Sequence, residues 1–495
     1  MSVSFGGQPD AVALRDSLAA GEGSVKAVVE ECLARIAEHN DRLGAFTRVE
    51  DERAHVRAAE LDAKRDAGEP LGPLFGVPVA IKANLCWKGA VADCSSKLLA
   101  NYRPPYDATV VRRLIDADAV IVGSTNMDEF AMGSSTENSA HGEAHNPWDE
   151  TRTPGGSSGG SAVAVAAGMV PVALGSDTGG SVRQPAALCG LLGLKPTYGR
   201  VSRYGLIAFG SSLDAVSPFA RTVRDVARTL EVISGACDRD STCLPLPPYE
   251  AVQPADPSRL AGFRIGVPKQ CFPPELDAGV RKCVEAALKE LERIGCELVP
   301  IELPHAELAI PTYYVVATAE ASSNLARYDG VSFGQRAGAH GTLQEMFAAT
   351  REAGFGEEVK RRVLLGTYVL SAGYQDEWYG RAQRARTKIL GDYQQAFEDV
   401  DLVVGPTSPC TAFRLGEKTA DPIAMYQTDL LTVPASLAGL PAISVPCGTS
   451  EGLPVGLQLV APAREDARVL RAAQAFELAT DHHRALPPML QGAGA

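Results

Sequence analysis

Residues 153–176 form a run of 24 residues without a charge, and this run limits the folds open to the 495-residue chain. Its length matches that of a membrane-spanning helix. It opens, however, with Pro154 and a cluster of glycines and serines, which do not form a continuous apolar helix. A second uncharged stretch, residues 430–450, contains three prolines. We therefore interpret both stretches as buried core, and we expect no membrane segment.

The overall composition, 45% hydrophobic and 22% charged, is that of a globular protein rather than a disordered, collagen-like or coiled-coil chain. The 47 Lys and Arg residues against 60 Asp and Glu residues give a net charge of −13, which argues against a large phosphate-binding face. The 11 cysteines lack CxxC or metal-type spacing, so free thiols in a reducing cytoplasm explain them best. The first residues also lack the features of a signal peptide. These observations favour a cytoplasmic location.

Hydrophobic periodicity predicts alternating helices and strands, and therefore an α/β fold with a large mixed central sheet covered by helices. Residues 1–67 are predicted to be a helical N-terminal segment, with Ser24 as the cap of one helix and residues 48–67 as another. We expect residues 1–495 to form a single domain, because no linker-like segment or internal repeat interrupts them. Strands are predicted at residues 76–82, 119–122, 263–267, 297–301, 401–405, 442–446 and 455–460, and a closing helix at 465–479. An amphipathic helix between the strands at 263–267 and 297–301 predicts a parallel pair.

The densest chemical signal is Gly155–Ser181, which reads GGSSGGSAVAVAAGMVPVALGSDTGGS. In one interpretation, glycine-rich turns bracket a tightly packed helix; in another, the glycines expose backbone amides around an anion, with serine as a nucleophile. A phosphate loop is not supported, because the GxxxxGK[ST] order is absent, and ATP binding by this chain is therefore not expected. Gly155–Gly159 matches GxSxG, but the turn-like residues before it do not provide the strand of a nucleophile elbow.

Ser181 ends a turn whose successive amides can converge on one oxygen, so this serine would lie beside its own oxyanion hole. A serine hydroxyl also needs a base, and none of the eight histidines is near in the sequence. Lys82 is an alternative base. An exposed lysine here would be a solvated strand residue, whereas burial would lower the pKa of its amine towards neutrality. The neighbouring pair Ser157 and Ser158 would then supply a relay for the proton.

Two other groups of residues are weaker candidates. Cys86 and Cys189 are alternative nucleophiles, but both lie in apolar segments where an inert buried thiol is expected. His141, Glu143 and His145 resemble a metal-binding pair at positions i and i+4, yet their order is not HExxH. We expect a surface loop there and no metal site.

Lys82 with its strand, the GGSSGGS cluster and the segment SDTGGSVRQPA resemble the amidase signature family, whose members hydrolyse carboxamides through a Ser–Ser–Lys triad. The resemblance implies that Ser181 is the nucleophile, that Lys82 is the base, and that Ser157 bridges them and is held by a cis peptide bond. Residues 72–215 would form the signature core.

The resemblance also implies supporting residues around this triad. Ser158 and Asp177 would stabilise the site by hydrogen bonding. The amides of the oxyanion hole would come from the turn at Thr178, Gly179, Gly180 and Ser181.

Three further segments, GRVSRYGLIAFGSSLD, GEEVKRRVLLGTYVLSAGYQDEWY and MYQTDLLTVPASLAGLPAISVPCG, resemble the glutaminase subunits of tRNA-dependent amidotransferases. This resemblance implies hydrolysis of glutamine to glutamate and ammonia, without a cofactor in this chain. Ammonia would pass to a B-type subunit that uses ATP and Mg²⁺ to amidate glutamyl-tRNA(Gln), or aspartyl-tRNA(Asn), with a C-type subunit joining the two. Charged tRNA would be contacted mainly through the partner. A stand-alone amidase and a non-catalytic scaffold are the alternatives.

Arg362 and Asp429 match the glutamine-binding positions of these subunits. A guanidinium at Arg362 would clamp the α-carboxylate of glutamine, and Asp429 would pair with its α-ammonium. From the pattern alone, Arg361 and Arg362 also fit a solvated helix face. Tyr313 is a further candidate for the pocket, with Tyr314 beside it. Residues 305–460 are accordingly expected to contain the substrate pocket and the partner-facing part.

Overall fold

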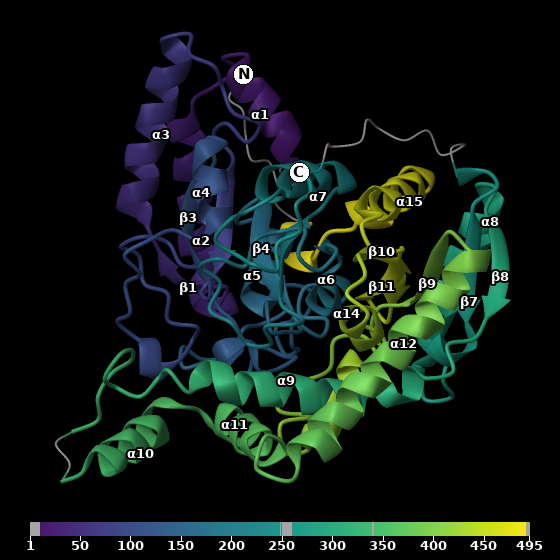
Figure 1. Ribbon diagram of the computed structural model, residues 1–495. Coiled ribbons are helices and arrows are strands. Elements are labelled where there is room, and N and C mark those ends of the chain that lie inside the picture. The colour runs from purple at the N-terminus through teal and green to yellow at the C-terminus, as the bar shows by residue number, and fades with distance from the viewer. Residues whose placement is uncertain (1–9, 248, 250–259, 339–340, 492–495) are drawn as a thin grey trace.

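The computed structural model describes residues 10–247, 249, 260–338 and 341–491. Within these residues, eleven strands form one mixed sheet in the order β1-β3-β2-β4-β6-β5-β10-β11-β9-β7-β8. Helices cover the sheet, and α9, α11 and α12 lie along one side of it (Figure 1). The predicted fold class is therefore confirmed. The strands are β1 (Phe46–Val49), β2 (Pro78–Lys82), β3 (Val120–Thr125), β4 (Val172–Asp177), β5 (Leu192–Lys195), β6 (Ala215–Ala220), β7 (Arg264–Pro268), β8 (Glu297–Ile301), β9 (Leu402–Pro406), β10 (Ala442–Ser450) and β11 (Leu453–Val460).

The helices are spread over the whole chain, and shorter 3-10 or π turns connect some of them. The turns used below are η2 (Glu129–Ala131), η6 (Gln375–Tyr379) and η7 (Gln427–Asp429). The α-helices are α1 (Ala11–Ala19), α2 (Val25–Leu43), α3 (Asp51–Asp66), α4 (Thr109–Asp116), α5 (Gly159–Ala166), α6 (Arg183–Cys189), α7 (Val223–Ile233), α8 (Ala278–Arg293), α9 (Ala309–Leu325), α10 (Leu343–Gly354), α11 (Glu357–Val369), α12 (Gly380–Asp399), α13 (Pro422–Tyr426), α14 (Val433–Leu437) and α15 (Asp466–Ala479).

The N-terminal segment is helical, with one correction. Ser24 caps α2 as predicted, because its hydroxyl accepts a hydrogen bond from the Ala27 amide at 3.1 Å. The predicted helix over residues 48–67 starts only at Asp51. The residues before it form β1, which pairs antiparallel with β3. Sheet pairing thus overrides the helical composition at the start of this segment.

The sheet is mixed because it contains both parallel and antiparallel pairs of strands. β2 pairs parallel with both β3 and β4, whereas β4 pairs antiparallel with β6. The predicted parallel pair of β7 and β8, with α8 between them in the chain, is confirmed. The carboxyl ends of β2 and β4 therefore point the same way, which brings Lys82 close to the turn after β4.

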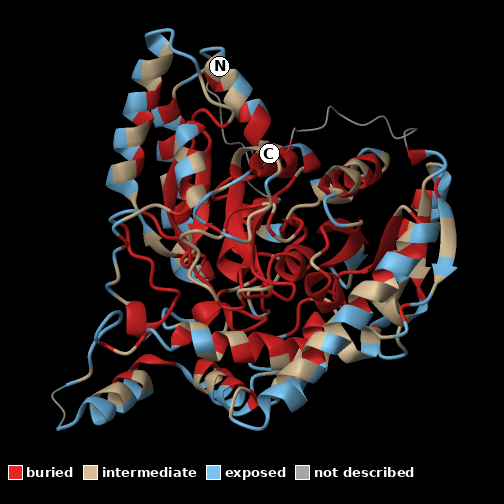
Figure 2. Cartoon of the chain, viewed as in Figure 1, coloured by how far each residue is buried: buried red, intermediate tan, exposed pale blue. Residues whose placement is uncertain are grey.

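Every residue of the uncharged run 153–176 is buried, as the sequence predicts for core. The run contains α5 and most of β4, an interior strand of the sheet. The buried residues occupy the middle of the molecule (Figure 2). Small side chains allow α5 to lie directly on the strands. Among the residues that the structure describes, no helix is long and apolar enough to cross a membrane.

Candidate active site

Lys82 is the last residue of β2, and its side chain is completely buried. Its ammonium nitrogen lies 2.8 Å from Ser157 Oγ and 2.7 Å from Ser158 Oγ. A third hydroxyl, that of Ser176, lies 3.0 Å away. The predicted lysine and the predicted serine pair are therefore in direct contact, although they are far apart in the sequence.

Burial changes the acidity of this lysine. Loss of solvent lowers the pKa of the Lys82 amine from its ordinary value to about 7. The opposing influence comes from three buried carboxylates, at Asp128, Asp214 and Asp177. None of them accepts a hydrogen bond from Lys82 within the described part of the chain. A neutral amine is therefore accessible near pH 7.

Ser157 follows Gly156 across a cis peptide bond and precedes α5. Its hydroxyl faces Lys82, and its carbonyl oxygen accepts a hydrogen bond from the Asp128 amide at 3.2 Å. Ser158 shares the same lysine and also donates to the Ser176 carbonyl at 3.2 Å. Both serines are fully buried, so neither is directly open to a substrate.

Ser181 lies in the turn between β4 and α6, and it is 7% exposed, whereas Lys82 and Ser157 are 0% exposed. Among these three residues only Ser181 is therefore open to solvent. The amides of the turn, from Thr178 to Ser181, donate no hydrogen bond to any described residue. Free amides that follow one another in a turn attract a developing negative charge. The turn thus has the properties predicted for an oxyanion hole beside a nucleophile.

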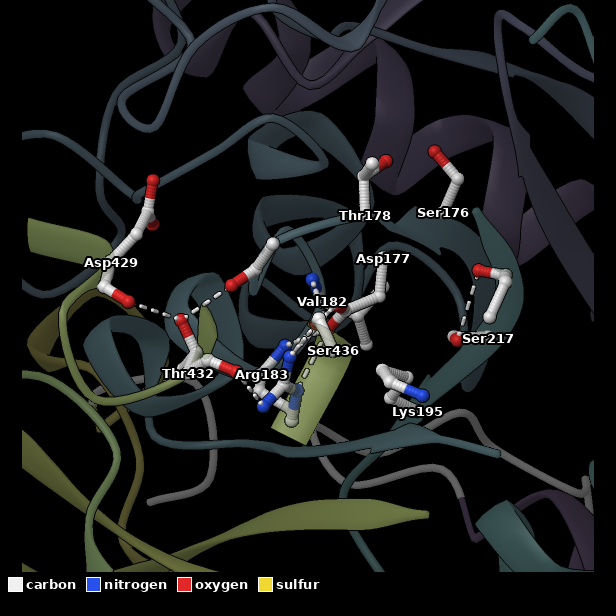
Figure 3. A network of polar contacts seen from close by, with 12 residues as sticks. Ser176, Asp177, Thr178, Val182, Arg183, Lys195, Ser217, Asp429, Thr432 and Ser436 are labelled. Carbon is white, nitrogen blue, oxygen red and sulfur yellow. Dashed lines mark hydrogen bonds and ion pairs between the residues drawn. The ribbon is translucent and has the colours of Figure 1, made fainter. Parts of the chain in front are cut away.

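An ion pair holds this turn (Figure 3). The carboxylate of Asp177 accepts hydrogen bonds from Arg183 Nε at 3.0 Å and Nη2 at 2.9 Å, and both residues are fully buried. Burial alone would raise the pKa of Asp177, but the Arg183 charge holds it below its ordinary value. Asp177 therefore stabilises the turn through Arg183 and makes no hydrogen bond to Lys82. The sequence motifs give Arg183 no role, although a charge in this apolar segment is a signal for a buried pair.

A second contact reaches the same turn from the C-terminal part of the chain. Thr432 Oγ1 donates to the Gly179 carbonyl at 2.7 Å, and Arg183 donates to the Thr432 carbonyl at 2.8 Å (Figure 3). Gly180 has a φ of +152°, and a Cβ atom there would lie 2.1 Å from Thr432 Oγ1. Glycine at this position is therefore required by the backbone and by the close approach of Thr432.

Arg362 lies on the inner face of α11, with 3% of its side chain exposed, whereas Arg361 beside it is 50% exposed. The solvated-face alternative thus holds for Arg361 and not for Arg362. Arg362 Nε donates to Glu358 at 2.7 Å. Its guanidinium lies 5.2 Å from the ring of Tyr314 and 5.3 Å from that of Tyr426. Neither Nη atom donates a hydrogen bond to a described residue, so both are free to bind an anion.

Asp429 ends η7 and is buried. Burial raises the pKa of its carboxyl group to about 7, although a hydrogen bond from Ser134 and the charge of Arg362 oppose this rise. The Asp429 carbonyl accepts a hydrogen bond from the Thr432 amide at 3.1 Å, which connects it to the turn. The ring of Tyr313 packs on Gly179, where a Cβ atom would lie 2.7 Å from it. Asp429 and Tyr313 thus lie beside the turn that carries Ser181, and Arg362 lies against Tyr314, the neighbour of Tyr313.

Several pocket residues have no signal in the sequence. Glu358 and Tyr426 hold Arg362 in place, since the Tyr426 hydroxyl donates to the same carboxylate at 2.9 Å. Tyr314 stacks on Tyr426 at a centroid distance of 3.8 Å. These contacts arise only when α9, α11 and α13 meet, so a linear pattern does not predict them.

The alternative nucleophiles and the metal-site candidates from the sequence analysis are buried or bind other residues in the structure. Cys86 and Cys189 are both buried, and burial raises the pKa of the Cys86 thiol to about 11. His141 Nε2 lies 2.9 Å from an oxygen of Asp93, and His145 Nδ1 lies 2.8 Å from the Glu150 carbonyl. The two rings thus have different partners, and a Glu143 oxygen lies 3.9 Å from His145 Nε2.

A buried lysine in contact with a serine pair, beside a turn of free amides that ends in a more exposed serine, defines a class of amide-cleaving enzymes. The Amidase family profile matches residues 27–470, and the chain belongs to this family. The crystal structure of native peptide amidase from Stenotrophomonas maltophilia aligns with 97% of this chain and 98% of its own, at a TM-score of 0.82 and 31% identity.

Within the family, the chain is similar to one particular protein, the A subunit of glutamyl-tRNA(Gln) amidotransferase. It is 53% identical to that subunit of Symbiobacterium thermophilum, over 96% of this chain and 97% of the relative. The same subunit of Geobacillus kaustophilus is 52% identical over 94% of this chain and 96% of the relative. The crystal structure of that subunit from Thermotoga maritima covers 92% of this chain and 91% of its own, with a TM-score of 0.76 and 42% identity.

Proposed function

We propose that this chain is the glutaminase subunit of a tRNA-dependent amidotransferase. The observation that carries the proposal is a buried aspartate and a buried arginine near the turn of Ser181. Asp429 is connected to the turn through Thr432. The Arg362 guanidinium lies 5.2 Å from the ring of Tyr314, whose neighbour Tyr313 packs on Gly179 of the turn. A free amino acid has a carboxylate and an ammonium group, so a pocket that recognises one needs a buried charge of each sign. The high identity to amidotransferase subunits supports the same assignment.

The mechanism follows from the order of the proton-transferring groups. Neutral Lys82 accepts a proton from Ser157, which takes the proton of Ser181, and Ser181 Oγ attacks the side-chain amide carbon of glutamine. The amides of the turn stabilise the oxyanion of the tetrahedral intermediate. The proton returns through Ser157 to the leaving nitrogen, and ammonia departs as the acyl-enzyme forms. Water then adds to the ester carbon, and its proton follows the same route as glutamate is released.

The substrate is held at its other end. Arg362 binds the α-carboxylate of glutamine through its free Nη atoms, and ionised Asp429 binds the α-ammonium group. Tyr313, which packs on the turn, borders the space between them. Binding at the α-carboxylate and the α-ammonium group thus places the amide carbon of glutamine at Ser181, although neither of these groups takes part in the reaction.

We propose that ammonia passes to a B-type subunit, where ATP and Mg²⁺ support the amidation of glutamyl-tRNA(Gln) or aspartyl-tRNA(Asn), and that a C-type subunit joins the two. This chain would use no cofactor of its own and would contact charged tRNA mainly through the partner. The absence of a P-loop sequence and the net charge of −13 support this division of labour. The 11 cysteines are all free thiols, which supports a cytoplasmic location.

An apolar surface on α11 and η6 supports a partner-facing role for this part of the chain. Leu364, Leu365 and Tyr368 are exposed on α11, and Trp378 follows on η6. The ring of Tyr374 lies 4.9 Å from that of Tyr368, which extends the patch beyond the helix. Contiguous apolar side chains of this kind are typical of subunit interfaces. We therefore propose that the B-type subunit, which must receive the ammonia, covers this surface.

A serine-reactive fluorophosphonate probe tests the proposal. We expect the probe to label the wild-type chain at Ser181, and we expect free glutamine to protect against labelling. Ser181→Ala is expected to abolish both labelling and glutaminase activity while the thermal unfolding temperature stays the same. Labelling without glutamine protection would indicate a stand-alone amidase for another carboxamide. A wild-type chain that is not labelled would favour a scaffold.

A further inference from the structure

Two consecutive acidic residues, Asp128 and Glu129, occupy a loop that the proposed mechanism does not use. Both are buried. The residues after them, Phe130 and Ala131, have φ values of +50° and +62°, which residues other than glycine rarely adopt. Such backbone conformations persist where the surrounding contacts require them. The two carboxylates supply such contacts, and they hold different parts of the site.

Asp128 holds the catalytic side of the site. Its amide donates to the Ser157 carbonyl at 3.2 Å. Its carboxylate accepts the amide of Thr136 at 2.9 Å and that of Ser135 at 3.3 Å, and these hydrogen bonds fix the rest of the loop. The loop also contains Ser134, whose hydroxyl donates to Asp429.

Glu129 reaches in another direction, to the start of α11. Its Oε2 accepts the Gly356 amide at 2.8 Å, and its Oε1 accepts the hydroxyl of Ser96. Gly356 is the N-cap of α11 and has no side chain to cap the helix. The Glu129 carboxylate therefore supplies a cap from a distant loop, and its negative charge is favourable at this end of a helix. Burial raises the pKa of the Glu129 carboxyl group to about 7, whereas the hydrogen bonds from Ser96 and Gly356 and the charges of Lys360 and Lys97 favour its ionised form. Lys360 is itself paired with Glu352 and Glu357.

Helix α11 carries Arg362 on its buried face. A Cβ atom on Gly366 would lie 1.9 Å from the Thr318 carbonyl of α9, so α9 fixes the helix sideways at this point. The hydrogen bond from Gly356 to Glu129 fixes the same helix at its N-terminal end. Arg362 lies between these two attachments.

We infer that Glu129 is a positioning residue. It fixes the position of Arg362 relative to Ser157, the serine whose carbonyl accepts the amide of the neighbouring residue Asp128. This inference rests on the proposed function, because it assumes that Arg362 binds the carboxylate of glutamine. Loss of the cap lets the start of α11 move, so that the two ends of glutamine no longer meet their partners together. Binding of the amino acid weakens, whereas the Lys82–Ser157 contact keeps its geometry.

The test separates glutamine binding from the reactivity of Ser181. Glu129→Met removes the acceptor at similar volume, and Glu129→Gln keeps an acceptor without the charge. Gly356→Ala acts on the same contact from the helix side, because its Cβ atom would lie 2.5 Å from Glu129 Oε2. Gly391→Ala on α12, where no atom lies within 4 Å of the new Cβ, is the matched control.

For each variant we measure the rate of fluorophosphonate labelling and the glutamine concentration that protects half of the sites. Glu129→Met and Gly356→Ala are expected to raise that concentration about tenfold, as for one lost hydrogen bond to a charged group. We expect Glu129→Gln to retain most of the wild-type affinity for glutamine. The double variant Glu129→Met/Gly356→Ala is expected to bind glutamine no more weakly than either single variant, because both changes remove the same contact. Labelling rates should stay within about twofold of wild type, as should all values for the control.

Three results would overturn the inference. Unchanged glutamine protection in Glu129→Met shows that the cap does not position the pocket. A fall in labelling rate that parallels the loss of protection shows a general structural role. A wild-type chain that glutamine does not protect removes the proposed substrate, and the inference fails with it.

Discussion

Lys82 and Asp429 are both buried, and burial moves the pKa of each side chain to about 7, downwards for the amine and upwards for the carboxyl group. The proposed mechanism needs the amine neutral and the carboxyl group ionised. Both groups reach these states when they lose a proton. Acidification therefore removes the base and the partner of the substrate ammonium together.

The pH dependence of glutamine hydrolysis follows from these two groups. We expect kcat/KM to rise with pH through about 7 and to level off at alkaline pH, since both groups work in their deprotonated forms. Steady-state kinetics in a series of buffers measures this profile.

Lys82→Met is expected to lower kcat at least about a hundredfold, as for loss of a general base. An activity that is highest at acidic pH would contradict the assignment of Lys82.

Arg362 and Arg361 offer a matched pair, because adjacent arginines differ in burial and in contacts. We expect Arg362→Ala to raise the KM for glutamine about a hundredfold with a smaller effect on kcat, since a buried charge-assisted pair with the substrate is lost. Arg361→Ala is expected to leave both constants near the wild-type values. Equal effects of the two substitutions would rule out a specific carboxylate clamp.

Among the residues of the site, those in a contiguous motif are predictable and those brought in by folding are not. Lys82, Ser157 and Ser181 each lie in a segment with a chemical pattern of its own. Asp128 and Glu129 act through a backbone amide and a helix end, so their partners depend on the loop conformation. Glu358 and Tyr426 matter only because they surround Arg362.

At the scale of elements, the contact of α9 with α11 determines the pocket wall. Gly366 lies where the helices are closest, and any side chain there meets the Thr318 carbonyl. We expect Gly366→Ala to lower the free energy of unfolding by about 1–3 kcal/mol, as for overpacking of a close contact. Gly391→Ala, which adds a methyl group in open space on α12, is expected to be neutral or to stabilise by up to about 1 kcal/mol. Chemical denaturation of both variants compares the two.

If Gly366→Ala were as stable as the wild type, the helices would have to separate without cost. This result would contradict the close packing of α9 and α11. The control at Gly391 distinguishes a packing effect from the general preference of helices for alanine over glycine.

The predictability of the elements depends on their side chains. β2, β8 and β11 contain runs of β-branched or large apolar residues, and the sequence predicts them within a few residues. β4, by contrast, lies in a run of small residues that is buried on both faces, so it shows no alternation and periodicity does not predict it. The end of β1 falls inside a predicted helix because its neighbours are charged and alanine-rich. Pairing with β3 is not visible in a local pattern.

At the scale of the whole molecule, helix α11, which carries most of the apolar patch, lies at the bottom of the view in Figure 1, whereas α3 lies at the upper left. Leu364 is 71% exposed in this patch, and Val56 on α3 is 57% exposed outside it. We expect Leu364→Glu to weaken co-purification with the B-type subunit by about tenfold or more, because a charge would be buried at the interface. Val56→Glu should have no such effect. Fluorophosphonate labelling of Ser181 should be the same in both variants.

Retention of the B-type subunit by Leu364→Glu would place the interface elsewhere on the chain. The location of the patch would then need another explanation, while the assignment of the active site would stand.

The overall α/β class and the single mixed sheet are predictable because the strand and helix patterns alternate along the chain. The exposed patch is not, since periodicity alone does not distinguish a helix face that packs inside from one that packs on another protein.

The enclosure of Lys82 has a consequence for the chemical durability of the protein. An uncharged primary amine reacts readily with aldehydes, cyanate and other electrophiles that cells contain. Here the same burial that lowers the pKa of the amine to about 7 also leaves it with no surface open to solvent. Reagents that modify lysines should therefore not react with Lys82 in the folded protein. The amine that the proposed mechanism uses as a base is thus protected from chemical modification.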